Sequence, residues 1–292
     1  MMFPLVQELD AAGFGVAAIC RTLAVSRSGY YRWAGAGPSA RDRDDAQLED
    51  RVRAVFAASR GTYGAPRIHA EVRMGTDPVR CGRKRIARLM RLAGLQGVFY
   101  PPRRGKNRPL PATQQDRVQR KFVADAPNRL WCTGITEHPT DEGKVYCAAV
   151  LDVYSRKIVG WAIADHIRAE LVVDALDMAR WNRKPLQGTI VHSDRGAQYT
   201  SWIFGHRLRE AGLLGSMGRV ASSVDNTMME SFWSSMQREL LDRQHWHTRQ
   251  ELGTAIFEWI EAWYNPRRRH SGIGYHAPHS YEALHNTAAP AT

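Results

Sequence analysis

The sequence predicts an α/β protein in which a mixed five-stranded sheet with helices follows an all-α region. Up to about residue 97 the apolar residues recur at helical spacing, whereas from residue 128 short β-branched and aromatic runs alternate with helical segments. Three strand-like runs come first, and alternating helix and strand follow, which favours a mixed sheet over a doubly wound one. A chain of 292 residues with 43% hydrophobic content is long enough for two domains and can fill a real core.

Residues 14–34 predict a helix-turn-helix. Val16, Ile19 and Leu23 lie on one helical face, and Ser26 can cap a second helix. Many small helical hairpins share this pattern, so it is typical of the motif without being unique to it. In a helix-turn-helix the second helix enters the major groove of DNA. We therefore expect three side chains of this helix to contact DNA: Arg27, Tyr30 and Arg32.

A second helical module is predicted over residues 46–97, and it ends in a basic amphipathic helix over 82–97. The stretch 78–115 contains ten Lys and Arg and no acidic residue, and its Pro- and Arg-rich part is typical of an extended tether. These cations favour contact with the DNA backbone, although a solvated face and linker would show the same pattern. The candidates are Arg83, Lys84, Arg85, Arg88, Arg103, Arg104 and Lys106.

The charge of the chain is concentrated in this first part. The net charge is +12; residues 1–127 carry 23 Lys and Arg against 11 Asp and Glu, while residues 128–292 carry 18 of each. Such an excess indicates a polyanionic partner, most simply double-stranded DNA, with an unpartnered basic surface as the alternative. Four dispersed cysteines, no signal peptide and no apolar run long enough to cross a membrane lead us to expect a cytoplasmic protein.

From residue 128 onward the sheet elements follow in order. Turn residues at 140–143 join the first two strands into a hairpin. A capping pattern at 248–251 opens a helix that Asn265–Pro266 ends. The strands are expected at 129–137, 144–152, 156–164, 188–193 and 213–217, with helices at 168–182, 202–211 and 226–241. We expect a helical DNA-binding region over 1–100, a basic linker over 101–127, a sheet domain over 128–245 and a helical extension over 246–292.

Two acidic residues are candidates for chemistry. Asp194 stands just beyond the apolar strand 188–193, where ligand sites collect in α/β sheets, although an Asp that ends a strand is common. Glu230 lies beside a buried stripe on the helix 226–241, and exposed glutamates are ordinary there. A hydrolytic triad of His192, Ser193 and Asp194 is excluded because adjacent strand residues point to opposite faces.

Ordered blocks of the chain resemble a known family. These blocks are "VAAICRTLAVSRSGYYRW", "RGTYGAPRIHAEV", "HSDRGAQYTS", "SSVDNTMMESFWSSMQREL" and "YNPRRRHSGIGY". Together they are similar to bacterial insertion-sequence transposases, the second-reading-frame products of family three, which have a retroviral-integrase-like catalytic core. The resemblance implies a ribonuclease-H-like sheet over 128–245 and two Mg²⁺ (or Mn²⁺) ions held by two aspartates and a glutamate. Asp194 matches the second acid, and Glu230 matches the third.

The first acid of the family falls on Gly134, within Trp131-Cys132-Thr133-Gly134-Ile135-Thr136 where the family has Trp-x-Thr-Asp-Ile-Thr. Neither Glu137 nor Asp152 is placed to replace it. We therefore expect a transposase that is impaired in Mg²⁺-assisted strand cleavage and joining. The alternative is an inactive copy that acts only as a DNA-binding protein, and a weaker one is a metal nuclease of ribonuclease-H type.

The remaining candidates surround this centre. The resemblance places Asp225 and Asn226 in the loop and helix start before the glutamate, and His192 near the second acid. Gln237 stands where many relatives have a basic residue, with Arg238 beside it, and Arg267, Arg268 and Arg269 form a cation cluster able to hold a phosphate. His276 and His279 are not expected to bind metal. The partners implied are element-end and target DNA, further copies of the chain and the upstream-frame product.

Overall fold

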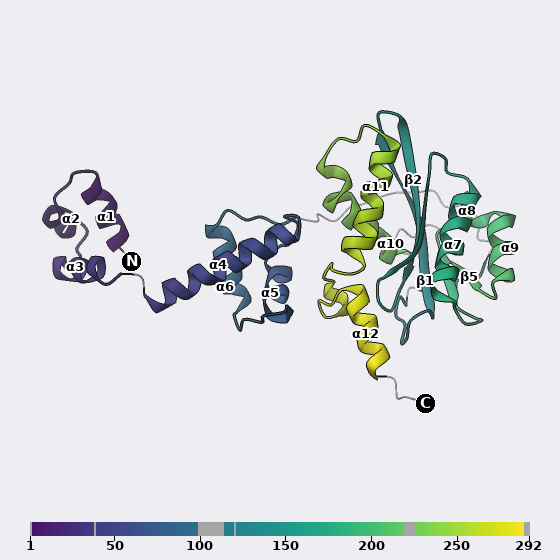
Figure 1. Cartoon of the computed structure of the whole chain (residues 1–292), viewed down its shortest axis with the longest axis horizontal. Helices are drawn as coiled ribbons and strands as arrows, with labels where there is room; N and C mark the ends of the chain where they lie inside the picture. The colour runs from purple at the N-terminus through teal and green to yellow at the C-terminus, as the bar shows by residue number, and fades with distance from the viewer. Residues whose placement is uncertain (1, 38, 99–113, 120, 219–225, 289–292) are drawn as a thin grey trace.

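The computed structural model describes residues 2–37, 39–98, 114–119, 121–218 and 226–288 (Figure 1). One five-stranded sheet has the order β3-β2-β1-β4-β5, in which β1, β2 and β3 are antiparallel and β4 and β5 run parallel to β1. This confirms the mixed sheet that the sequence predicts. The strands are β1 (Leu130–Thr140), β2 (Gly143–Asp152), β3 (Ile158–Ala164), β4 (Ile190–Ser193) and β5 (Leu214–Met217).

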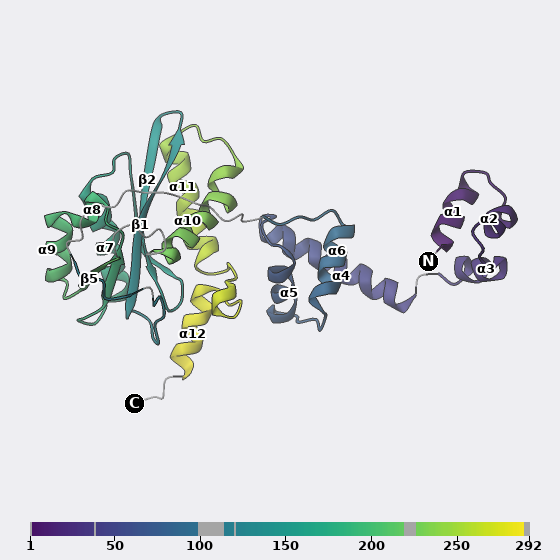
Figure 2. The same ribbon diagram turned by 180° about the vertical axis from the view of Figure 1, so that it is seen from behind.

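Helices lie on both faces of the sheet, as Figures 1 and 2 show from opposite sides, and alternate residues of the central strands face the two layers. Trp131 and Val150 face helices α7 (Ala169–Arg183) and α9 (Trp202–Glu210). Gly160 on β3 allows α7 to lie this close, because an added Cβ would stand 2.2 Å from the Ala175 carbonyl oxygen. The short helix α8 (Ala197–Thr200) lies between β4 and α9 along the chain.

The other face of the sheet carries α10 (Thr227–Glu239) and α11 (Arg249–Glu258). Cys132, Cys147 and Leu151 share one apolar cluster with side chains of these helices, because they point away from α7. The C-terminal part continues through a 3-10 turn (Leu241–Arg243), a π-helical turn (Trp259–Tyr264), a second 3-10 turn (Ser271–Ile273) and α12 (Pro278–Ala288).

The N-terminal part contains two helical units. Helices α1 (Phe3–Ala11), α2 (Val16–Thr22) and α3 (Arg27–Gly35) enclose a small core of their own, and α1 was not predicted. The Ser26 hydroxyl accepts a hydrogen bond from the Gly29 N–H at 3.2 Å, which confirms the predicted cap of α3. The second unit consists of α4 (Ala40–Ala58), α5 (Ala65–Met74) and α6 (Arg83–Leu92).

The second helical unit packs against the C-terminal part. The rings of Tyr63 and Trp263 lie 5.6 Å apart, and the Tyr63 hydroxyl accepts the Arg269 N–H at 2.7 Å. Apolar side chains of α4, α5 and α6 therefore belong to the same cluster as α10 and α11. Among the described residues, no helix has the length and apolar character needed to cross a membrane.

Candidate active site

Neighbouring strands β1 and β4 carry the first two acid positions: Gly134 lies inside β1, and Asp194 directly follows β4. The two strands are parallel, with Trp131 paired to Val191 and Cys132 to His192. Continued by two residues, this register would place Gly134 beside Asp194, the first residue after β4. Neighbouring strands lie about 4.8 Å apart, so the strand pairing favours adjacent positions for these two residues.

Helix α10 covers Gly134. A Cβ added at this glycine would lie 3.1 Å from Nε1 of Trp233 and 3.4 Å from Cβ of Met229. Glu230 follows Met229 directly and is exposed in the first turn of the helix. Phe232 and Met236 are buried in the core on the side of α10 that faces away from Glu230. Their burial fixes the rotation of the helix about its axis, so Glu230 stays exposed. Glu230 therefore lies on the part of α10 that covers Gly134.

A side-chain hydrogen bond from Asn226 connects the start of α10 to β1. Its Nδ2 donates a hydrogen bond to the carbonyl oxygen of Thr133 at 2.9 Å, on the residue before Gly134. The Thr133 hydroxyl lies 3.3 Å from the hydroxyl of Tyr199. Asn226 thus positions the helix start, and Asp225, its predicted companion, falls outside the described residues.

The two carboxyl groups have raised pKa values. Surrounding protein atoms desolvate the Asp194 carboxyl group and raise its pKa, while the Gly196 N–H, which donates to Oδ1 at 2.9 Å, and His192 oppose the shift. Desolvation likewise raises the pKa of Glu230. Both side chains remain exposed by surface area, so solvent and ligands reach them in spite of this crowding. Nε of Arg195 donates to the Gly218 carbonyl oxygen at 2.7 Å, which ties the loop after β4 to the end of β5.

The donor chemistry of this candidate site fits a hard divalent cation. Carboxylate oxygens are the ligands that Mg²⁺ and Mn²⁺ prefer, and Asp194 and Glu230 supply them. Two buried polar atoms near position 134, Nε1 of Trp233 and Oδ1 of Asn226, have no hydrogen-bond partner within the described part of the chain. Unpaired buried polar atoms are uncommon, so these surroundings match a polar side chain better than a glycine.

Several predicted DNA contacts are placed where DNA can reach them. Arg27 and Arg32 are exposed on α3, and Arg83 and Lys84 are exposed at the start of α6. Two further arginines of α6, Arg85 and Arg88, both pair with the carboxylate of Asp45 and are partly exposed. Gln237 donates to Asp242, and Arg238 lies in the last turn of α10. The predicted contacts Arg103, Arg104 and Lys106 fall outside the described residues.

Burial corrects two of the predicted contacts, and it also places His192. Tyr30 is 4% exposed and packs against Phe3 and Trp33 in the small N-terminal core, so it stabilises the helix-turn-helix instead of contacting DNA. His192 is buried between β4 and β5, with Nδ1 3.0 Å from the Ser216 hydroxyl. It therefore lies on β4 and supports the strand that directly precedes Asp194.

Arg268 is the second corrected contact. It is 2% exposed, and its guanidinium donates two hydrogen bonds of 2.7 and 2.6 Å to the buried carboxylate of Glu239. A third hydrogen bond of 3.0 Å reaches the Ser235 hydroxyl on α10. Arg268 therefore anchors α10 to the C-terminal part and does not bind phosphate. Arg269 is mostly covered and pairs with Glu71, whereas Arg267 is exposed.

The buried His270 should make stability depend on pH. Burial and, second, the charge of Arg268 hold the pKa of His270 well below its usual value. In the unfolded chain the imidazole takes up a proton near pH ~6.5. The stabilisation is therefore complete above that pH, and it falls by up to ~1.4 kcal/mol per pH unit as the pH drops toward the folded pKa.

Denaturant unfolding between pH 7 and pH 5.5 measures this effect. The variant His270→Gln should show a flatter dependence of unfolding free energy on pH than the parent chain. The matched control His206→Gln removes a partly exposed histidine of α9 and should leave the slope unchanged. An unchanged slope in His270→Gln would contradict the prediction.

Trp233 was missed as a residue of the site. The sequence assigns it wholly to the buried stripe of α10, beside Phe232. Its indole nitrogen instead stands over Gly134, at the place where a side chain of that residue would begin. The only available signal was its three-residue spacing from Glu230, which puts both side chains on the same side of the helix.

Family models match most of the chain. An HTH-like domain matches residues 42–104, and two models of an integrase core domain match residues 124–223 and 212–278. With the sheet order and the two candidate acids, these matches define the class as integrase-core polynucleotidyl transferases.

Curated relatives narrow this class. The transposase for insertion sequence element IS904 from Lactococcus lactis is 38% identical over 247 residues, which cover 84% of this chain and 97% of the relative. Transposase InsF for insertion sequence IS3A from Escherichia coli K12 is 35% identical over 280 residues, covering 94% of this chain and 96% of the relative. The chain belongs to the insertion-sequence transposases of the IS3 family.

Two of the solved structures that match come from retroviral assemblies. The catalytic core domain of HTLV-2 integrase in complex with magnesium gives a TM-score of 0.42 at 15% identity, over 55% of this chain and 99% of that chain. A chain of the simian T-cell lymphotropic virus intasome in complex with PP2A regulatory subunit B56 gamma gives a TM-score of 0.44 at 10% identity, over 82% of this chain and 75% of that chain. The family assignment rests on the sequence relatives.

Proposed function

We propose that this transposase uses Asp194 and Glu230 to hold two divalent cations, Mg²⁺ or Mn²⁺, against a DNA phosphate, and that Gly134 impairs the reaction. Three observations support the proposal: α10 covers Gly134 inside β1, Glu230 lies in the first turn of that helix, and Asp194 directly follows β4, the parallel neighbour of β1. Such cations supply charge stabilisation to the attacking and leaving oxygens of an in-line displacement.

In this proposal, some residues bind the cations and others position the helix that carries Glu230. Asp194 and Glu230 provide carboxylate oxygens, while Asn226 and Trp233 set the position of α10 above β1. With glycine at 134, the site supplies two carboxylates where the family uses three. The cations would then be bound more weakly and held less firmly, and a misplacement of about 1 Å can cost ~10²-fold in rate.

Among the described residues, Glu137 and Asp152 do not take the place of the missing carboxylate. Glu137 pairs with Lys144 at 2.6 Å, three residues further along β1. Asp152 lies opposite Trp131 and is fully buried, where it accepts the Asn128 N–H at 2.8 Å. Both carboxylates are therefore engaged elsewhere.

A second candidate function is DNA binding without catalysis, which Gly134 and the exposed cations of α3 and α6 favour. Such a copy would occupy element ends and compete with an active transposase. In either function the DNA partner is double-stranded, and further copies of the chain and the upstream-frame product are proposed to assemble with it.

Strand joining on element-end DNA with Mg²⁺ or Mn²⁺ tests the two functions. Joining that Asp194→Asn and Glu230→Gln abolish supports an impaired enzyme, and binding with no joining supports the alternative.

The basic surface of α6 should give DNA binding a measurable salt dependence. Each phosphate contact contributes about −0.9 to the slope of log K against log[salt] for duplex DNA. We expect the double variant Arg83→Ser/Lys84→Ser to make this slope shallower by about one to two, since both side chains are exposed at the helix start. Fluorescence anisotropy with a labelled duplex at several salt concentrations measures it. Arg209→Ser, an exposed arginine of α9, is the control that should keep the parental slope; equal slopes in all three proteins would exclude this surface.

A further inference from the structure

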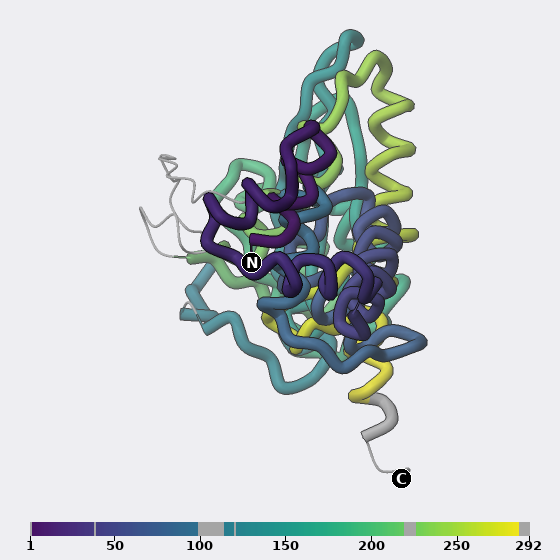
Figure 3. Tube along the Cα trace, turned by 90° about the vertical axis from the view of Figure 1, so that its left-hand side faces the viewer, coloured from purple at the N-terminus to yellow at the C-terminus, as the bar shows by residue number. Residues whose placement is uncertain are grey.

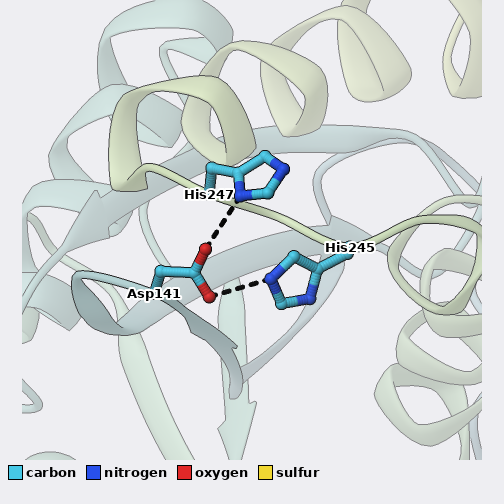
Figure 4. A group of neighbouring side chains, drawn as sticks. All are labelled: Asp141, His245 and His247. Carbon is cyan, nitrogen blue, oxygen red and sulfur yellow. Dashed lines mark hydrogen bonds and ion pairs between the residues drawn. The ribbon is translucent and has the colours of Figure 1, made fainter.

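Two histidines and an aspartate meet on the surface at the tip of the β1–β2 hairpin (Figure 4). Nε2 of His245 lies 2.8 Å from Oδ1 of Asp141, and Nδ1 of His247 lies 2.8 Å from Oδ2. One ligand atom from each residue lies within 4.8 Å of the other two. All three side chains are exposed. This is the one group of its kind among the described residues.

The backbone around the cluster is fixed by contacts that do not involve the three side chains. Trp246, between the two histidines, is 3% exposed, and its indole N–H donates to the Leu241 carbonyl oxygen at 3.0 Å. The Asp141 N–H donates to the Trp246 carbonyl oxygen at 3.2 Å. Because neighbours in an extended segment point to opposite sides, burying Trp246 directs His245 and His247 to the same side, toward Asp141.

Two further hydrogen bonds join the same segments. The His247 N–H donates to Oε2 of Glu251 at 3.1 Å, and the Arg249 N–H donates to Oε2 of Glu142 at 2.9 Å. Figures 1 and 3 both show the hairpin tip beside the start of α11. The three side chains are thus presented by two elements that are already held together, so a ligand would need only side-chain rotation to bring them closer.

We propose that Asp141, His245 and His247 form a binding site for a borderline divalent transition-metal ion, with Zn²⁺ as the physiological candidate. Two imidazoles and one carboxylate form a ligand set that Zn²⁺ takes up, with ligand atoms ~2.0–2.2 Å from the ion and a fourth position for water. Mg²⁺ prefers oxygen ligands and keeps several waters, so this site discriminates against it.

The site is separate from the proposed catalytic site. Asp141 lies seven residues beyond Gly134 along the β1 direction, which is roughly 23 Å at ~3.3 Å per residue. An ion bound there would cross-link the hairpin tip to the segment that leads into α11. Its effect is on the stability of this end of the core, and it does not depend on the proposed function of Asp194 and Glu230.

Titration of the untagged full chain with Co²⁺ tests the site. Co²⁺ reports four-coordinate nitrogen and oxygen ligation by visible absorption bands more intense than those of an octahedral oxygen site. We expect one such site that Zn²⁺ displaces, and a Zn²⁺-dependent rise in thermal unfolding temperature that EDTA reverses. His245→Ala, His247→Ala and Asp141→Asn should each weaken Zn²⁺ binding at least ~10-fold and remove the rise. The unfolding temperature of each variant is compared with and without metal, so a change in the stability of the metal-free variant does not affect the measured Zn²⁺-dependent shift.

Two controls separate this site from others. His206→Ala removes a partly exposed histidine that already faces a carboxylate, Glu210, and should keep both the absorption and the thermal shift. The double variant Asp194→Asn/Glu230→Gln should also keep them, because those acids lie at the other site. If the parent shows no Zn²⁺ effect, or if the three variants bind as the parent does, the cluster is only a hydrogen-bonded clamp and the proposal is overturned.

Discussion

Replacing Gly134 with aspartate should raise strand joining on element-end DNA in Mg²⁺ by roughly 10²-fold or more. A metal ligand at this position contributes several kcal/mol of transition-state stabilisation, and each 1.36 kcal/mol corresponds to about tenfold in rate. The new carboxylate would complete the set with Asp194 and Glu230 at the proposed site formed by β1, β4 and α10.

The space for this side chain is narrow but present. The added Cβ would stand 3.1 Å from Nε1 of Trp233, so the indole must move by a few tenths of an ångström. That movement carries a benefit, because the indole N–H has no partner among the described residues and can donate to a carboxylate. We therefore expect Gly134→Asp to fold, with little loss of stability.

Gly134→Asn separates charge from shape. Asparagine has the size of aspartate and meets the same contact with Trp233, but its neutral amide is a poor ligand for Mg²⁺. Gel-based strand-transfer assays on the parent, Gly134→Asp and Gly134→Asn should rank aspartate far above the other two. Equal joining by the parent and Gly134→Asp would refute the impairment. Equal gains from Asn and Asp would show that filling the space, and not adding charge, restores the reaction.

Arg268→Ala should destabilise the protein by about 3 kcal/mol. Removing one partner of a buried ion pair leaves an uncompensated charge, which costs ~3–5 kcal/mol. Glu239 would be that charge, with its side chain fully buried at the end of α10. The lower end of the range is expected because Arg67 remains 3.5 Å from Oε1 of Glu239.

The neighbouring Arg267 supplies the matched control. It is exposed, so Arg267→Ala should change the unfolding free energy by less than ~0.5 kcal/mol. The double variant Arg268→Met/Glu239→Leu removes both buried charges and should recover much of the loss. Chemical denaturation measures all three. If Arg268→Ala lowered DNA affinity while leaving stability unchanged, the original assignment of Arg268 as a phosphate contact would stand.

The sequence predicted the sheet well because its strands carry strong local signals. The strand that ends before Asp194 is short and apolar, and the hairpin turn between β1 and β2 appears as predicted, with Thr140 paired to Gly143. The helix-turn-helix was also recognisable, since Ser26 caps α3 as its position indicated. Each of these features depends on residues close together in the chain.

The misassigned residues share a different cause. Arg268 follows a helix stop among three consecutive arginines, and Tyr30 lies on a helix with exposed arginines. Composition alone made both look like surface contacts. Their burial depends on partners far along the chain, Glu239 for Arg268 and Phe3 for Tyr30. A spacing pattern within one segment carries no information about such partners.

The sequence by itself determined the family, the mixed sheet and the presence of glycine at an acid position. Motifs and hydrophobic periodicity depend only on residues that are close together in the chain, so they can be recognised without the tertiary structure. Only the tertiary structure decided that Trp233 stands over Gly134, that Arg268 is an internal anchor of α10, and that His245 and His247 meet Asp141. These are contacts between segments separated by many residues. They are selected by the burial of α10 and Trp246 against the sheet and the C-terminal part, which is a property of the whole packed core.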